Sequence, residues 1–286
     1  MFIGTEKLTH TYMPGTPFAT EALDEVSFSL KRGEFALIIG PSGSGKSTLV
    51  QHLNGLLRPT SGRVFFEGQE ISSDKRGLLH LRRRIGLVFQ MPEEQFFSES
   101  VYAEVAFAPH NLGLDESEIK NRVKDALGKV GLNAEQLQDR HPFQLSAGQK
   151  RLVAVAAVLS LNPEVLILDE PTAGLDPAGR RNLFDLLAML NRDSGLTVII
   201  STHHLDEVAA LADRIIVLQH GRLVLEGVAK EILTRRQQLD DLGLALPAVT
   251  EILHGLAERG LPVRTDIFTL AGARAEINKL KGRREL

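Results

Sequence analysis

The 286-residue sequence contains no cysteine and has no excess of basic residues. Without cysteine, a disulfide framework and a thiolate metal site are excluded, which fits a cytosolic protein. A formal net charge of −3 gives no reason to expect nucleic acid as a partner. Apolar residues make up 43% of the chain, which is enough for one large or two modest packed units.

Long apolar runs are also lacking. The longest candidate, Leu152 to Leu161, is only about half of the ~20 residues that span a bilayer. The first residues, Met1 to Glu6, lack the basic and then apolar pattern of a signal peptide. We therefore expect any contact with a membrane to come through partners only.

A glycine-rich loop follows an apolar run, Glu34 to Ile39, and precedes a helix-compatible run that begins at Thr48. It matches G-x-x-x-x-G-K-[ST], in which backbone N–H groups surround a polyphosphate at the positive end of a helix. Lys46 is expected to reach the β- and γ-phosphates, and the hydroxyl of Ser47 to bind Mg²⁺. A glycine-rich turn is the alternative, but the strand before and the helix after favour nucleotide binding. The nucleotide-binding residues expected in this loop are Gly40, Pro41, Ser42, Gly43, Ser44, Gly45, Lys46, Ser47 and Thr48.

Two adjacent acids end a second apolar run, Val165 to Leu168. This run predicts a strand buried on both faces, as in a parallel sheet, where ligands gather at the carboxyl ends of the strands. A core strand does not explain the two acids, because unpaired buried carboxylates are costly. We expect Asp169 to anchor Mg²⁺, and Glu170 to act as the base that positions and polarises an attacking water. A nucleotide kinase could share this layout.

A short polar loop, Leu145 to Arg151, precedes a helical run and the strand that carries the two acids. Here the sequence resembles the ATP-binding-cassette (ABC) ATPases, whose signature loop reads LSGGQ. The resemblance implies that the loop closes over the nucleotide of a second subunit, with Ser146, Gly148 and Gln149 suited to hold a γ-phosphate. An ordinary helix cap is the alternative, since serine is a favoured N-cap. Ala147 replaces the family's usual first glycine, and its methyl group would obstruct a positive φ angle.

The remaining motifs of this family occur in the family's order. Gln90 matches the Q-loop glutamine, which can touch Mg²⁺ or the water, and Asp176 matches the D-loop, which crosses to the partner subunit. His203 matches the switch histidine that donates to the γ-phosphate. Tyr12 matches the adenine-stacking aromatic, an interaction worth ~1 kcal/mol beyond burial. Each residue alone would be read as ordinary surface or core, but together they imply catalytic roles for Gln90, His203, Lys46 and Glu170.

The resemblance implies an α/β fold, a P-loop NTPase of the ABC type with a mixed or parallel sheet core. The ABC ATPase domain is expected over residues 1–234, with a RecA-like core in 1–90 and 160–234. A helical subdomain is expected to be inserted at residues 91–159. A short C-terminal helical extension, and candidate dimer contact, is expected over residues 235–286.

Local patterns support helices in the inserted subdomain and in the C-terminal extension. Asp115 and Glu118 resemble a capping pair at the start of a helix in the inserted subdomain. The segment Leu242 to Pro247 and the amphipathic run Val249 to Leu256 predict the C-terminal helical extension.

Longer stretches resemble the ATPase subunits of energy-coupling factor (ECF) transporters. The matching stretches are Tyr12 to Phe18, Gln51 to Gly62 and Val88 to Phe97. The implied machine imports a vitamin or a transition-metal ion, and its ATPases lie at the cytoplasmic face of the cell membrane. It joins two such ATPases, as a homodimer or heterodimer, to a transmembrane scaffold subunit and a substrate-binding membrane subunit.

In that machine the scaffold docks beside the Q-loop, where two acids and two phenylalanines would suit basic, partly apolar helices. The alternative is a solvated acidic loop over two core aromatics. The residues of this docking segment are Glu93, Glu94, Gln95, Phe96 and Phe97.

The sequence therefore predicts a peripheral membrane ATPase that uses ATP and Mg²⁺ and works as a dimer. A generic ABC importer ATPase is the first alternative. A soluble ABC ATPase acting on nucleic acid or ribosomes is the second; such proteins carry a long coiled coil or two cassettes in one chain, and this sequence has neither. A small-molecule kinase would have no use for Ser146 to Gln149 or His203.

Overall fold

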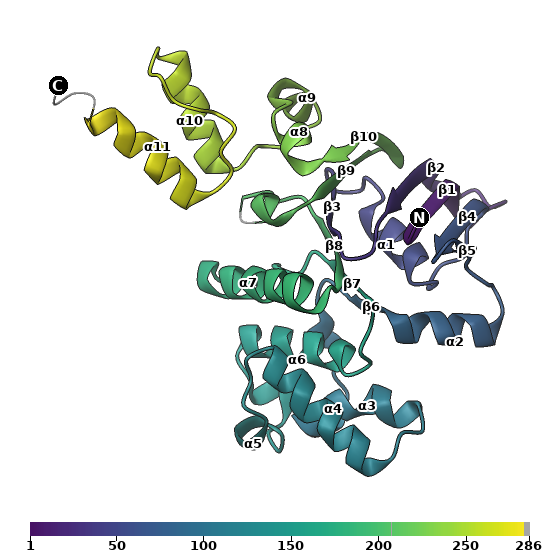
Figure 1. Cartoon of the computed structure of the whole chain (residues 1–286). Coiled ribbons are helices and arrows are strands. Elements are labelled where there is room, and N and C mark those ends of the chain that lie inside the picture. The colour runs from purple at the N-terminus through teal and green to yellow at the C-terminus, as the bar shows by residue number, and fades with distance from the viewer. Residues whose placement is uncertain (207, 283–286) are drawn as a thin grey trace.

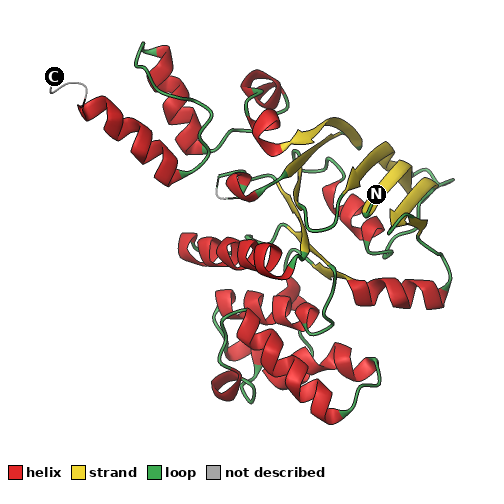
Figure 2. Ribbon diagram, viewed as in Figure 1, coloured by secondary structure: helices red, strands yellow, loops and turns green. Residues whose placement is uncertain are grey.

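The computed structural model describes residues 1–206 and 208–282. Two sheets lie side by side, a group of helices packs below the larger sheet, and further helices extend from its other end (Figure 1). Figure 2 shows that the strands gather at the centre and the N-terminal side, while helices form the periphery. This arrangement confirms the α/β class and the mixed sheet that the sequence predicts.

The larger sheet contains six strands in the order β10-β9-β3-β8-β7-β6. The five strands from β9 to β6 in this order run parallel to one another, whereas the edge strand β10 pairs antiparallel with β9. Its strands are β3 (Phe35–Ile39), β6 (Ile85–Val88), β7 (Val165–Asp169), β8 (Thr197–Thr202), β9 (Arg214–Gln219) and β10 (Arg222–Val228). Parallel neighbours need crossover connections, and α7 (Pro177–Ser194) forms the one from β7 to β8. Helix α1 (Lys46–Leu53) follows β3 and leads toward the smaller sheet.

The smaller sheet is antiparallel and has the order β2-β1-β4-β5. Its strands are β1 (Ile3–Tyr12), β2 (Thr20–Leu30), β4 (Ser61–Phe66) and β5 (Gln69–Glu70). Helix α2 (Lys75–Arg84) leads from this sheet into β6, and Asp74 caps its first turn.

Between β6 and β7 the chain forms the helices that lie below the sheet in Figure 1. These elements are η1 (Pro92–Gln95), α3 (Val101–Asn111), α4 (Glu116–Lys129), α5 (Ala134–Leu137), η2 (Pro142–Gln144) and α6 (Ala147–Leu159). Asp115 caps α4 by accepting a hydrogen bond from the Glu118 backbone at 2.9 Å. Helix α4 buries Ile119, Val123 and Leu127 on one face, as its periodicity predicts.

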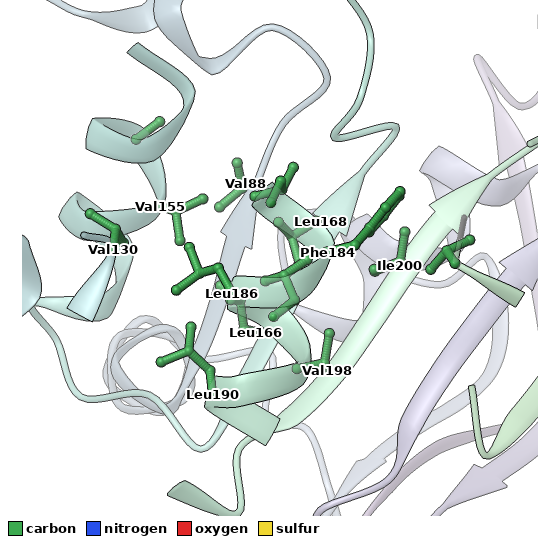
Figure 3. Close-up of a cluster of buried hydrophobic side chains, with 14 of the residues drawn as sticks. Val88, Val130, Val155, Leu166, Leu168, Phe184, Leu186, Leu190, Val198 and Ile200 are labelled. Atoms are coloured by element: carbon green, nitrogen blue, oxygen red, sulfur yellow. The ribbon is translucent and has the colours of Figure 1, made fainter. Parts of the chain in front are cut away.

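The core lies on both faces of the larger sheet. Along β3, Phe35, Leu37 and Ile39 pack toward the helices, whereas Ala36 and Ile38 pack toward α1 and the smaller sheet. This alternation follows from the two-residue period of a strand that is buried on both sides. Figure 3 shows the helix side, where side chains of α6 and α7 meet those of β7 and β8. The carboxyl ends of β3, β7 and β8 are therefore packed on both faces of the sheet.

The C-terminal part follows η3 (Ala209–Leu211) and the last two strands. It contains α8 (Ala229–Leu233), α9 (Arg236–Asp241), α10 (Ala248–Glu258) and α11 (Leu270–Gly282). The predicted helical extension is present, but the segment 242–247 is a connection that buries Leu244 and Leu246 rather than a helix. The backbone N–H of Ala248 donates to Asp206 Oδ1 at 2.7 Å, so α10 contacts the segment that follows β8.

Within residues 1–206 and 208–282, none of the helices combines the length and the apolarity that a bilayer span requires. The domain boundaries expected at residues 90, 159 and 234 stay predictions.

Candidate nucleotide-binding and hydrolysis site

The glycine-rich loop joins β3 to α1, where the sequence places it. Gly45 precedes the helix with a φ of 101°, and a Cβ at this position would lie 2.6 Å from the carbonyl oxygen of Ala22. Only glycine meets both conditions. The loop therefore turns tightly into α1 and directs the positive end of that helix toward the loop's interior.

Lys46 is buried within this loop. Its Nζ donates to the carbonyl oxygens of Gly40 at 2.8 Å and Pro41 at 3.0 Å. The nearest carboxylate is that of Glu170, at 3.9 Å from Nζ. Burial lowers the pKa of the Lys46 ammonium, and the negative charges of Glu170 and Asp169 oppose this change. A buried ammonium with so little anionic compensation is suited to an incoming phosphate.

Asp169 and Glu170 lie where β7 ends, next to β8. Asp169 is buried, and its Oδ1 accepts a hydrogen bond from the hydroxyl of Ser201. The backbone N–H of Glu170 donates to the carbonyl oxygen of Ser201 at 2.9 Å. Ser201 thus holds both acids in place, a role that the sequence analysis did not assign. The signal was present, since Ser201 stands two residues before His203 on the adjacent strand.

Glu170 has a φ of 45°, in the left-handed region that residues other than glycine rarely adopt. This conformation turns its side chain toward the end of β8, where His203 Nδ1 lies 2.8 Å from Glu170 Oε1. Strained backbone at such a position is typical of functional sites. The structure therefore brings Lys46, Glu170 and His203 together, although they come from three separate segments.

Tyr12 lies at the end of β1 and contacts the first turn of α1. Its hydroxyl is 3.1 Å from Thr48 Oγ1, and its ring meets His10 edge to face, with centroids 4.5 Å apart. His10 in turn contacts His52 of α1, with centroids 4.6 Å apart. These contacts hold the Tyr12 ring beside the phosphate loop. Its stacking on adenine stays a prediction.

The signature segment forms the start of α6. Ser146 is its N-cap and accepts from the Gln149 backbone at 3.2 Å, while Gln149 Oε1 accepts from the Ser146 backbone at 3.1 Å. The capping box shows that Ser146 is an ordinary helix cap, the alternative to a phosphate-binding role. A cap and a phosphate contact can occur at the same helix end, so the two roles do not conflict. Ala147 is the first helical residue, where φ is negative, so its methyl group is compatible with the observed backbone.

Gln90 and Asp176 lie on separate loops. Gln90 follows β6 with an exposed side chain, and Asp176 caps α7 by accepting from the Gly179 backbone at 2.6 Å. Arg151, in α6, connects these regions: it donates to the carbonyl oxygens of Gln90 at 2.6 Å and Ala173 at 2.9 Å. The sequence alone does not indicate a buried arginine here, because its partners are distant along the chain.

The docking segment has an inner and an outer side. Phe96 is only 8% exposed and belongs to the core, whereas Phe97 is 64% exposed and meets Phe107 edge to face at 4.6 Å. Glu94 and Gln95 are exposed. Glu93 turns inward, and its Oε1 lies 3.5 Å from a terminal nitrogen of Arg151. The surface open to a partner is therefore formed by Glu94, Gln95 and Phe97 rather than by all five residues.

Comparison with protein families matches residues 23–173 to the ABC transporter family, which is more than half of the chain. The energy-coupling factor transporter ATP-binding protein EcfA2 of Clostridioides difficile (strain 630) is 48% identical over 281 residues, covering 98% of both chains. The protein of the same name from Symbiobacterium thermophilum is 50% identical over 272 residues, covering 95% of this chain and 94% of that one.

Solved structures give the same result. The structure of cbiO1 from Clostridium perfringens, described as part of the ABC transporter complex cbiONQ, has a TM-score of 0.76 and 41% identity. It covers 88% of this chain and 98% of its own. A dimeric post-hydrolysis state of the ATP-binding cassette MJ0796, bound to ADP and Pi, has a TM-score of 0.72 and 32% identity, and covers 80% and 99% of the two chains.

Proposed function

Since this chain belongs to the ABC transporter family, and within it to the energy-coupling factor transporter ATP-binding proteins, we propose that it hydrolyses ATP to power import through a membrane scaffold. The observation that carries the chemistry is the group of Lys46, Glu170 and His203 at one end of the larger sheet. A carboxylate that is hydrogen-bonded to an imidazole and lies 3.9 Å from a buried ammonium suits phosphoryl transfer to water.

The roles of these residues follow from their positions. Lys46, held by the carbonyl oxygens of the loop, would bind the β- and γ-phosphates. Glu170 would accept the proton of the attacking water, and His203, 2.8 Å away, would orient Glu170 and donate to the γ-phosphate. Tyr12, fixed against Thr48, would stack on the adenine.

The residues present also fit a magnesium ion. This ion prefers oxygen ligands and is usually held by one or two protein groups together with substrate phosphates. The hydroxyl of Ser47, the carboxylate of Asp169 and the amide oxygen of Gln90 supply such ligands. When bound, Mg²⁺ would neutralise charge on the phosphates.

Each nucleotide would lie between the phosphate loop of one subunit and the signature loop of another. Ser146 and Ala147 are exposed, so the start of α6 is open to a partner subunit. Asp176, at the start of α7, would lie at the same interface. ATP would favour the closed pair by contacts that exist only in that state, and hydrolysis would reopen it.

The scaffold would dock on Glu94, Gln95 and Phe97, at the cytoplasmic face of the membrane. One acid beside the exposed Phe97 and Phe107 rings suits a basic, partly apolar helix. We propose a second cassette and a substrate-binding membrane subunit as the other partners. A vitamin or a transition-metal ion is the proposed cargo.

Glu94→Lys and Phe97→Ala are each expected to weaken scaffold binding by at least about tenfold, because like charge or a lost aromatic anchor at an interface costs more than 1.4 kcal/mol. Co-purification of the scaffold with the tagged chain measures this effect, and higher salt should partly restore Glu94→Lys. Glu135→Lys and Leu79→Ala, which change an exposed acid and an exposed apolar residue elsewhere, should bind normally. Normal scaffold recovery with both docking variants would place the contact elsewhere.

A further inference from the structure

Arg151 is the most deeply buried charged residue of the described chain, at 1% exposure. A buried guanidinium is costly unless its hydrogen bonds are satisfied, and an apolar side chain would fill the same space in α6 without that cost. Its neighbours Val153 and Ala154 are buried and apolar. The guanidinium must therefore be explained by what it binds rather than by packing.

The partners of Arg151 come from two separate segments, the loop after β6 and the turn after β7. One terminal nitrogen donates to the carbonyl oxygen of Gln90, and the other donates to the carbonyl oxygen of Ala173. The second nitrogen also lies 3.5 Å from Glu93 Oε1. Glu93 is partly buried, and its other oxygen finds no hydrogen-bond partner within the described residues. Arginine suits this position because its planar fork reaches two acceptors at once.

Each contact leads to a loop with its own role in the proposed mechanism. Arg151 lies in α6, five residues after Ser146. Ala173 lies in the turn after β7, and its backbone N–H donates to the carbonyl oxygen of Glu170 at 3.3 Å. Gln90 begins the loop that leads into η1, whose outer side carries Glu94. One side chain thus connects the signature helix, the turn that holds Glu170 and the docking segment.

We propose that Arg151 is a positioning residue that makes the signature loop, the Gln90 loop and the Glu170 turn move as one unit, with Glu93 holding its guanidinium. The expected effect of Arg151 on catalysis rests on the proposed ATPase function, whereas its contacts with the two loops do not. A displacement of η1 by a docked partner would reach Arg151 through Glu93. From there it would reach both the start of α6 and the turn that carries Glu170.

Hydrogen exchange of the full-length chain without nucleotide tests the geometry directly. In Arg151→Met, the amides of the non-proline residues in 89–95 and 172–176 should exchange at least tenfold faster, while those in 42–48 should exchange at the unmodified rate. Arg122→Met is the matched control, because Arg122 bridges α4 to the carbonyl oxygen of Ser160 and touches neither loop. It should leave both segments unchanged. A uniform rise in exchange, or an equal rise in the control, would reduce Arg151 to a general stabilising role and overturn the proposal.

ATP-binding and hydrolysis measurements test the expected effect of Arg151 on catalysis. In Arg151→Met the dissociation constant of a fluorescent ATP analogue should stay within threefold, whereas kcat for ATP hydrolysis in the assembled complex should fall at least tenfold. Arg151→Lys should recover only part of this loss, since one ammonium cannot serve both carbonyl oxygens in the same geometry. Unchanged kcat, or full recovery with lysine, would contradict the proposal.

Failure of Arg151→Met to fold and absence of ATP hydrolysis can each be distinguished from failure of the proposed positioning role. If Arg151→Met does not fold, Glu93→Gln keeps the arginine and should give the same exchange pattern with a smaller increase; an unmodified pattern in Glu93→Gln would count against the role of Glu93. If the unmodified chain itself does not hydrolyse ATP, the proposed function fails. The exchange result still decides the positioning role in that case, because it is measured without nucleotide.

Discussion

Replacing Glu170 with glutamine is expected to slow ATP hydrolysis by about 10²–10⁴-fold, the usual contribution of a general base, while ATP affinity stays close to that of the unmodified chain. Glutamine keeps the shape of the side chain and its position beside His203, but its amide cannot take a proton from water. The phosphate loop and Lys46 are untouched, so ATP should still bind and hold the dimer closed. Phosphate release at saturating ATP and binding of a fluorescent ATP analogue measure the two quantities.

Glu135→Gln is the control for this experiment, because it makes the same chemical change at an exposed residue of α5. Its hydrolysis rate should equal that of the unmodified chain. A Glu170→Gln variant that hydrolyses ATP at a near-normal rate would remove Glu170 from the role of base. The contact with His203 would then serve only to shape the turn after β7.

Replacing Lys46 with alanine should instead weaken ATP binding itself. Hydrogen bonds to charged groups contribute about 1.5–3 kcal/mol, so the dissociation constant should rise by about 10-fold to 10²-fold. The loop supplies no substitute cation, because Lys46 is the one basic residue in 40–48. Equilibrium titration with a fluorescent ATP analogue gives the dissociation constant directly.

Lys75→Ala removes an exposed lysine at the start of α2 and controls for the loss of positive charge. It should bind ATP normally. Unchanged ATP affinity in Lys46→Ala would show that the glycine-rich loop is not the phosphate site, whatever its backbone geometry.

Local sequence predicts the parts of the fold that depend on neighbouring residues. The apolar runs that became β3 and β7 are buried on both faces, and the Asp115 cap begins α4 as expected. The helical character of the segment 242–247 was not correct, since its leucines pack against the core without forming a helix. Burial alone does not distinguish a helix from a packed connection of this length.

The site could be predicted less completely, because its geometry depends on contacts between distant segments. Lys46, Asp169, Glu170 and His203 stand in recognisable motifs, but the turn of Glu170 toward His203 depends on its positive φ. Arg151 follows Lys150 in a polar stretch of the sequence, where a solvent-exposed pair of cations is the simpler expectation. Its burial depends on residues that are far away in the sequence.

Phe96 and Phe97 illustrate the same limit. The two residues are adjacent and identical in type, so sequence alone assigns both to the docking surface. The backbone after η1 is extended, and extended neighbours point in opposite directions. One ring therefore joins the core while the other meets Phe107 at the surface.

Purification of the tagged full-length chain from its native membranes, followed by an ATPase assay of the eluate, tests the proposed transport function most directly. The predicted result is that a polytopic membrane subunit and a cassette partner elute with the chain. The eluate should hydrolyse ATP, and the same complex carrying Glu170→Gln should form normally but hydrolyse ATP at least tenfold more slowly. Recovery of the chain with ribosomes or nucleic acid instead, or hydrolysis that is indifferent to Glu170→Gln, would contradict it.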